Sequence, residues 1–157
     1  MVHRHLIDVH VLLTEGDRLL LTQRGGSDRF AGRWHLPSGK VDRDEPITVA
    51  AAREAFEEVG ALIDPADLRV VHVVHVAGSG PEPRLGIFLH AAQWRNEPGN
   101  SEPEKCLAVQ WFPVGDLDQV DIIEYPAEGI RAFLTGASVS FGESGWGSAH
   151  YRVPVVV

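Results

Sequence analysis

The chain has 157 residues, of which 44% are hydrophobic and 23% are charged, close to the average for globular domains. These values exclude collagen, a coiled coil and a disordered chain, and the length predicts one domain spanning residues 1–157. Fourteen Lys and Arg residues against 22 Asp and Glu residues give a net charge of −8, which disfavours long nucleic acid as a partner but allows a single nucleotide held through a divalent cation.

The cysteine content and the length of the apolar runs predict the cellular compartment of the protein. Cys106 is the only cysteine, so no disulfide can form within the chain, and we expect this residue to fill a small core position. No apolar run reaches the roughly 18 residues that span a bilayer, and the first residues lack the pattern of a secretion signal. We therefore expect a soluble, cytoplasmic protein that does not bind membranes. The eight histidines do not follow a zinc-site spacing, so zinc is not expected.

The N-terminal third predicts strands separated by turns. Residues 5–13 and 18–22 are dense in apolar residues on either side of the turn sequence Glu15-Gly16-Asp17, which predicts a hairpin. A Gly-rich break follows at residues 25–28, and residues 34–39 predict a short strand that enters a tight turn. This turn should expose backbone groups.

The segment between Pro46 and Gly60 predicts a helix. Proline suits the first turn because its missing N–H would have no partner there, and residues 47–59 are rich in helix formers. Gly60 is a typical stop signal. Asp44 is the expected cap, and Glu45 is expected in the first turn, where a negative charge suits the helix dipole.

The C-terminal half continues the mixture of elements. Strands are predicted at residues 68–76, 84–94 and 107–112, an exposed loop at 96–105, one helical turn at 114–117 and a helix at 127–134. The core should cover about residues 5–135, and the tail 137–157 carries no clear prediction. Since strands and helices mix without regular βαβ alternation, we expect an α+β fold, an α/β/α sandwich in which helices flank a mixed sheet.

Three carboxylates share one face of the predicted helix. Glu54, Glu57 and Glu58 are three and four residues apart, so their side chains are neighbours on the helix surface. Like charges at this spacing repel one another. The face is therefore either solvated, which is the ordinary fate of a charge run, or neutralised by a cation.

The residues around these carboxylates carry a resemblance to a known family. The chain fits the pattern G-x5-E-x7-R-E-U-x-E-E-x-G-U, where U is aliphatic, with Gly39, Glu45, Arg53, Glu54, Glu57, Glu58 and Gly60 at the fixed positions. In this pattern it resembles the Nudix hydrolases. Two departures are mild: small Ala55 and Ala61 fill the U positions, and Ser38 stands where many relatives have Gly. Residues 19–24, 34–41 and 111–113 are also similar to the family.

The resemblance implies a fold, a cofactor and a reaction. The Nudix fold would place a loop-helix-loop at residues 39–61 and would bind Mg²⁺ or Mn²⁺. The implied ligands are the carboxylates of Glu54, Glu57 and Glu58 and the backbone carbonyl of Gly39, hard oxygen donors that suit these ions. The implied reaction is hydrolysis of a phosphoanhydride bond in a nucleoside diphosphate linked to a second group X.

Further roles follow from the same resemblance. Arg53 would pair with Glu45 and orient the ligands. The general base stays open: the family often uses a glutamate in the loop before the last core strand, where Glu102 and Glu104 stand, but Glu54 or Glu58 could serve. The family also often forms homodimers.

The substrate is chosen outside the pattern. The short single-domain chain, with an N-terminal hairpin directly before the pattern, is most similar to the MutT-like enzymes. This similarity favours a nucleoside triphosphate diphosphatase that releases pyrophosphate and a nucleoside monophosphate. Arg24 and Lys40 are candidate phosphate contacts, and Glu124 and Tyr125 in the segment 121–125 are candidate base contacts, unless Tyr125 only packs at the approach to a helix. The alternatives are an ADP-ribose or sugar-nucleotide pyrophosphatase and a non-catalytic nucleotide sensor, with isomerisation of isopentenyl diphosphate ranked last.

Overall fold

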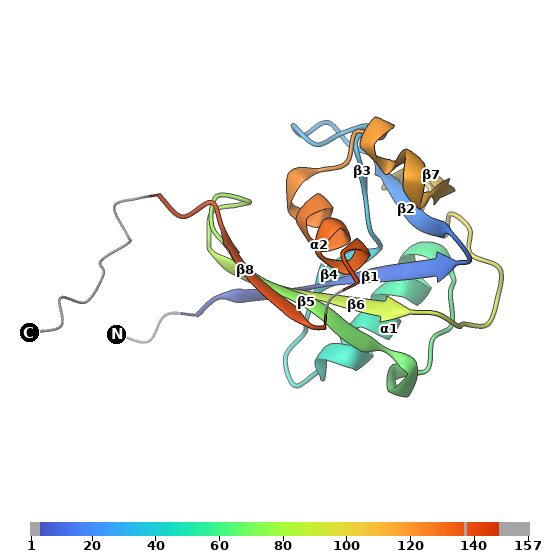
Figure 1. The fold of residues 1–157 in the computed structure, drawn as a ribbon, viewed down its shortest axis with the longest axis horizontal. Helices are drawn as coiled ribbons and strands as arrows, with labels where there is room; N and C mark the ends of the chain where they lie inside the picture. Colours follow the sequence, from blue (N-terminus) through green and yellow to red (C-terminus); the bar gives the residue numbers. More distant parts are fainter. Residues whose placement is uncertain (1–3, 137, 148–157) are drawn as a thin grey trace, which may run out of the picture.

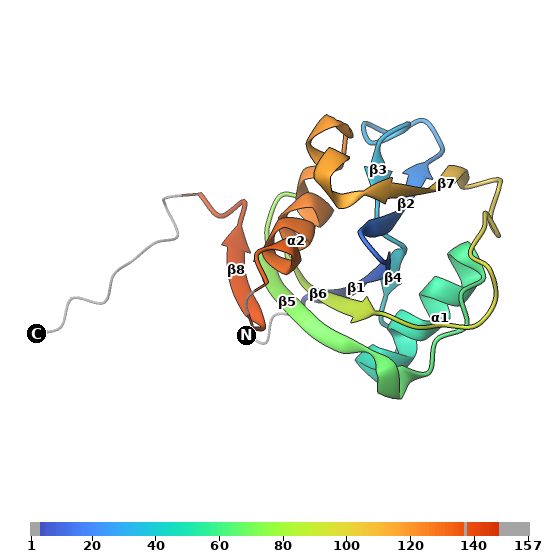
Figure 2. The same cartoon turned by 45° about the vertical axis from the view of Figure 1, so that its right-hand side comes forward.

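The computed structural model describes residues 4–136 and 138–147. In this part a mixed sheet has the strand order β3-β2-β1-β6-β5-β8, with β4 paired to β1 and β7 paired to β2. Helices α1 (Ile47–Val59) and α2 (Glu124–Leu134) lie on opposite sides of the sheet (Figures 1 and 2), which confirms the expected fold class. The strands are β1 (Leu6–Glu15), β2 (Arg18–Arg24), β3 (Trp34–His35), β4 (Ser38–Lys40), β5 (Arg69–Val76), β6 (Arg84–Ala91), β7 (Cys106–Pro113) and β8 (Ser140–Ser144).

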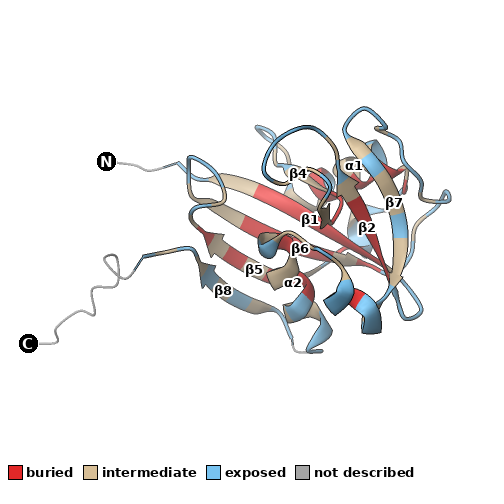
Figure 3. Cartoon of the chain, turned by 90° about the horizontal axis from the view of Figure 1, so that it is seen from above, coloured by how far each residue is buried: buried red, intermediate tan, exposed pale blue. Residues whose placement is uncertain are grey.

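Alternation along β1 divides the core in two. Val9, Val11 and Leu13 pack in the cluster that contains the buried alanines of α1, whereas Leu12 packs in the cluster under α2. Successive side chains of a strand point to opposite faces, so the even positions, including the buried polar residue His10, face α2. Figure 3 shows that burial is concentrated in the central strands.

Most predicted elements are present near their expected positions. The hairpin forms between β1 and β2, and β5 pairs with β6 in an antiparallel manner. Helix α1 has the predicted bounds and ends at Gly60, which adopts the left-handed conformation with φ 73°. The expected helical turn after β7 is a 3-10 helix, η2 (Val114–Gln119), and a second, η1 (Pro65–Asp67), precedes β5. Neither α1 nor α2 is long and apolar enough to cross a membrane.

The start of α1 differs from the expectation. Pro46 occupies the cap position, no side chain caps the helix, and its first turn contains no acidic residue. Asp44 instead lies in the preceding turn with φ 62°. Glu45 stays outside the helix because its carboxylate pairs with the Nε and Nη2 of Arg53, and a bidentate charged pair is stronger than attraction to a helix terminus. The predictions for Asp44 and Glu45 were therefore wrong.

Two features near the C-terminus were not predicted. Helix α2 begins at Glu124, three residues before the expected start, with Pro126 in its first turn, where proline is tolerated. Strand β8 pairs in parallel with β5 although its sequence, SFGES, is no typical strand. Its partner is the edge of the sheet, which a local sequence pattern does not reveal. The rest of the tail, residues 148–157, lies outside the described part.

Gly129 holds α2 against the sheet. A Cβ at this position would overlap the ring of Phe88 on β6. We expect Gly129→Ala to lower the free energy of unfolding by about 2 kcal/mol, because overpacking of a core outweighs the better helix propensity of alanine. Urea denaturation would measure this loss. The control is Gly115→Ala in η2, where a Cβ would have no neighbour within 4 Å, and an equal effect of both changes would contradict the expectation.

Candidate active site

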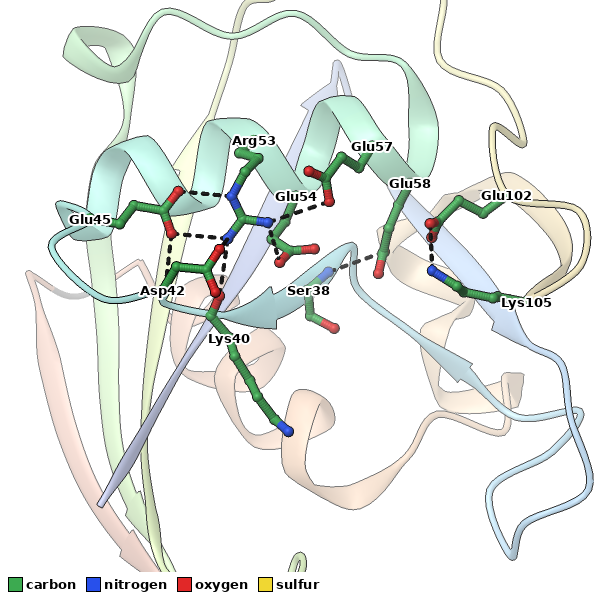
Figure 4. A network of polar contacts seen from close by, with 10 residues as sticks. All are labelled: Ser38, Lys40, Asp42, Glu45, Arg53, Glu54, Glu57, Glu58, Glu102 and Lys105. Atoms are coloured by element: carbon green, nitrogen blue, oxygen red, sulfur yellow. Dashed lines mark hydrogen bonds and ion pairs between the residues drawn. The ribbon is translucent and has the colours of Figure 1, made fainter. Parts of the chain in front are cut away.

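Arg53 organises one end of the carboxylate face of α1 (Figure 4). Its Nε and Nη2 donate to the two carboxylate oxygens of Glu45 at 2.8 and 2.9 Å, and its Nη1 donates to Glu54 at 2.8 Å and to Glu57 at 3.3 Å. Nη2 also donates to the backbone carbonyl of Lys40 at 3.1 Å. One guanidinium thus ties α1 to β4 and to the loop between them, with the pairing to Glu45 that the resemblance implies.

These contacts shift the protonation of the groups involved. The hydrogen bonds from Arg53 lower the pKa of Glu45 to about 2, with further help from a backbone N–H of Asp42. The same pairing raises the pKa of Arg53 itself. Burial raises the pKa of Glu54, although Arg53 opposes this rise. The network therefore keeps Glu45 and Arg53 charged at neutral pH.

Glu58 lies at the other end of this face and turns away from Arg53 (Figure 4). Its Oε2 accepts a hydrogen bond from the backbone N–H of Ser38 at 3.2 Å. Burial raises its pKa to about 8, and the negative charges of Glu54 and Glu102 add to the rise. The nearby Lys105 opposes it only in part, since its Nζ donates to Glu102 at 2.7 Å. A negative charge on Glu58 is thus left without full compensation by the protein.

Gly39 on β4 lies directly against Glu54. A Cβ at position 39 would overlap the carboxylate of Glu54. Only glycine lets the carboxylate and this backbone approach so closely. The structure therefore brings two of the predicted metal-ligating groups, the Gly39 backbone and the Glu54 side chain, into contact.

The donor set fits a divalent cation in its chemistry. The groups are carboxylate and carbonyl oxygens, which hard cations prefer, and the uncompensated Glu58 carboxylate favours a positive charge nearby. Within the described residues, no three His, Cys, Asp or Glu side chains surround a common point that could hold a metal. The reason is visible in Figure 4: Arg53 holds Glu54 and Glu57, whereas Glu58 turns to Ser38.

A cavity of about 300 Å³ opens beside this face, and its lining includes Gly39 and Glu58. Arg24, Lys40 and Tyr125, three predicted substrate contacts, line the same cavity. The Arg24 guanidinium is also paired with Asp28 at 2.7 Å. Residues far apart in the sequence thus meet around one cavity, which two of the predicted metal ligands, Gly39 and Glu58, line and which Glu54 and Glu57 do not.

A second cavity, of about 550 Å³, adjoins the first and shares Phe30, Ser79, Ile123 and Tyr125 with it. Glu124 lines only this second cavity, and its carboxylate accepts hydrogen bonds from Arg33 at 2.9 and 3.1 Å. Glu124 and Tyr125 form the first turn of α2 rather than a loop. Both predicted base contacts therefore line the second cavity, and only Tyr125 also lines the first.

The loop before β7 places its two candidate glutamates differently. Glu102 lies beside Glu58 (Figure 4), and its charge acts on both Glu54 and Glu58. Glu104 is exposed. Cys106, expected in the core, is half-buried at the start of β7.

Polar residues on the strands under α2 were missed by sequence reasoning. Asp8, His10 and Arg84 line the first cavity together with His35. Burial lowers the pKa of His10 to about 3 and that of His35 to about 4, so both rings are neutral at pH 7. Asp8 and His10 interrupt an otherwise apolar strand, and this was the signal that could have identified them.

Comparisons with known proteins agree with this geometry. A family model described as NUDIX domain matches residues 4–133. The putative 8-oxo-dGTP diphosphatase 2 of Mycobacterium tuberculosis is 43% identical over 111 residues, which cover 69% of this chain and 74% of that protein. Phosphatase NudJ of Escherichia coli is 27% identical over 106 residues, 66% of this chain and 67% of that protein. The crystal structure of a MutT NUDIX hydrolase from Burkholderia pseudomallei matches with a TM-score of 0.73 and 27% identity, and covers 83% of this chain and 98% of that one.

Proposed function

Since the chain belongs to the Nudix hydrolase family, we propose that it hydrolyses a phosphoanhydride bond in nucleoside triphosphates and releases pyrophosphate and a nucleoside monophosphate. One observation carries this proposal. The carboxylate face of α1 ends at the half-buried Glu58, and the cavity beside Glu58 and Gly39 is also lined by the cations Arg24 and Lys40. A polyphosphate could therefore meet acidic metal ligands and basic side chains in one place.

The proposed metal ligands are the carboxylates of Glu54, Glu57 and Glu58 and the backbone carbonyl of Gly39. Mg²⁺ or Mn²⁺ bound there would offset negative charge on the phosphoanhydride and lower the pKa of a water. Arg53 and Glu45 act as positioning residues, because Glu45 holds the Nε and Nη2 of Arg53 while its Nη1 donates to the carboxylates of Glu54 and Glu57. The metal-ligating side chains are thus oriented by the loop that precedes their own helix.

The remaining roles follow from the two cavities. Arg24 and Lys40 attract the polyphosphate by their charge, and Tyr125, which lines both cavities, contacts the rest of the nucleotide. Glu102 replaces Glu104 as the loop candidate for the general base, because its carboxylate lies beside Glu58. Glu54 and Glu58 remain the alternatives on the helix itself.

Two observations bear on the class of substrate: the name of one relative and the volume of the second cavity. The name of the Mycobacterium tuberculosis relative, a putative 8-oxo-dGTP diphosphatase, supports a nucleoside triphosphate. The second cavity, of about 550 Å³, favours one alternative, since it offers room for a larger group X. In that case the substrate would be ADP-ribose or a sugar nucleotide.

A screen with identification of the products tests the proposal. Nucleoside triphosphates, oxidised nucleotides, ADP-ribose and sugar nucleotides would be incubated with the protein and Mg²⁺, and the products identified by mass. We expect pyrophosphate and a nucleoside monophosphate, and no product after chelation of the metal. Tight nucleotide binding without any product across the panel would contradict the proposal and indicate a sensor.

A further inference from the structure

Buried polar atoms without a hydrogen-bond partner gather around the first cavity. In the described part of the chain these atoms are His10 Nδ1 and Nε2, His72 Nε2, Ser79 Oγ, Arg84 Nε and Tyr125 Oη. All of them except His72 Nε2 belong to residues that line the cavity beside Glu58. Buried polar groups are nearly always paired, because an unpaired one costs free energy. Several such groups around one cavity therefore offer hydrogen-bond donors and acceptors to a molecule bound there.

The pairing of β1 with β6 places these groups under α2. Asp8 on β1 lies opposite Gly86 on β6, and the Nη1 of Arg84 donates to Asp8 Oδ2 at 2.9 Å. This pair holds the guanidinium but leaves its Nε as an unpartnered donor. Gly86 has no side chain, and the Tyr125 hydroxyl lies where a Cβ would be. Arg84 and Tyr125 thus reach the same end of the cavity.

This end of the cavity is aromatic and nearly neutral. The ring of His10 stacks on Phe88 with centroids 4.5 Å apart and planes at 9°, and it meets the edge of Tyr125 at 4.7 Å. His10 carries no charge, since burial lowers its pKa to about 3, and Arg84 is balanced by Asp8. An uncharged heteroaromatic ring fits this environment better than an anion does.

We propose that Arg84, held by Asp8, is a specificity-determining residue that selects nucleotides whose base carries an oxo group over nucleotides whose base carries an amino group at the same position. The inference rests on the proposed function, because the base must belong to the substrate of the neighbouring carboxylates. It adds to that function the chemical class of the base.

The reason lies in the balance of donors and acceptors. Arg84 can only donate a hydrogen bond, whereas His10, Ser79 and Tyr125 can each donate as well as accept. A carbonyl oxygen offers two lone pairs to these donors. An exocyclic amino group would place its own N–H against Arg84 Nε and leave that donor unpaired, and sites built to hydrogen-bond a substrate reject analogues that cannot do so.

Matched pairs of substrates test this proposal. Inosine and adenosine triphosphates carry an oxo and an amino group at one ring position, as do uridine and cytidine triphosphates. We expect kcat/KM to favour the oxo member of each pair by about tenfold or more, and Arg84→Met to bring the ratio to about one by lowering kcat/KM for the oxo member alone. Arg69→Met, which changes an exposed arginine of β5, should keep the wild-type ratio.

A double variant guards against a folding defect. Arg84→Met leaves the buried Asp8 unpaired and can destabilise the protein, so Asp8→Asn combined with Arg84→Met removes both charges. Its melting temperature should stay near that of the wild type while the oxo preference is lost. Equal loss for both members of a pair, in a folded variant, would overturn the role of Arg84, and so would a wild type without preference.

A binding measurement separates this inference from the proposed function. Inosine and adenosine monophosphates would be titrated against the metal-free protein by calorimetry. Stronger binding of the inosine compound that disappears in the double variant supports Arg84 even if no triphosphate is hydrolysed. Hydrolysis of triphosphates with equal binding of the two monophosphates would leave the proposed function standing and contradict the inference.

Discussion

Glu58→Gln is expected to abolish turnover without loss of stability. Turnover should fall by about 10³-fold, comparable to the removal of a charge-stabilising group from an active site, because an amide cannot replace a carboxylate as a ligand of a hard cation. The melting temperature without metal should stay near that of the wild type, since burial raises the pKa of Glu58 to about 8 and a neutral amide replaces a largely protonated carboxyl of the same shape. Steady-state kinetics and thermal denaturation would measure the two effects.

Magnesium itself provides a second readout for Glu58. A ligand that binds only the folded state raises the melting temperature by mass action, so Mg²⁺ should stabilise the wild type and leave Glu58→Gln unchanged. The control is Glu97→Gln, which changes an exposed glutamate outside the proposed site and should behave as the wild type. If Glu58→Gln kept both full turnover and the response to Mg²⁺, the assignment of Glu58 as a ligand would be wrong.

Arg53→Met should impair both stability and activity. The change removes the guanidinium donors from the partly buried carboxylates of Glu45 and Glu54 and from the exposed Glu57, and partly buried groups that lose a partner are costly. We expect the free energy of unfolding to fall by about 2 kcal/mol and kcat/KM to fall by about 10²-fold, as for other groups that orient metal ligands. Arg53→Lys should recover only part of the free energy of unfolding and part of kcat/KM, because an ammonium group lacks the planar fork of a guanidinium.

The pH dependence of stability gives Arg53 a distinct signature. Arg53 lowers the pKa of Glu45 from 4.5 to about 2, so the folded state favours the ionised carboxylate. This stability is present above pH 4.5 and is lost as the pH falls from there toward 2. Urea denaturation at several pH values should show that loss in the wild type and in Arg43→Met, an exposed neighbour, but much less of it in Arg53→Met. A wild-type slope in Arg53→Met would contradict the pairing.

Local signals were sufficient for α1 and for the chemistry it carries. Pro46 and Gly60 mark the two ends of the helix through their own backbone geometry, and the spacing of Glu54, Glu57 and Glu58 puts them on one face in any helix. The family pattern is also local, so the resemblance could be recognised from contiguous residues. The first-turn position of Glu45 was mispredicted because Glu45 has a partner, Arg53, that the preference of a helix terminus for negative charge does not take into account.

Other parts of the fold and of the candidate site depend on contacts between residues that are distant in the sequence. Strand β8 exists through its pairing with β5, and Glu102 rather than Glu104 faces the carboxylates because of the path of its loop. The early start of α2 turned two expected loop residues, Glu124 and Tyr125, into a first helical turn that lines the cavities.

The amino-acid sequence by itself determined the position of α1, the carboxylate face with its arginine, and the family to which they belong, because these depend on the spacing of residues within one helix and one turn. Only the tertiary structure decided that Asp8 and Arg84, 76 positions apart, form a buried pair beside His10 and Tyr125. That pair depends on the register of β1 with β6 and on the packing of α2 over them. Register and packing are settled by long-range burial, which no short segment of the chain encodes.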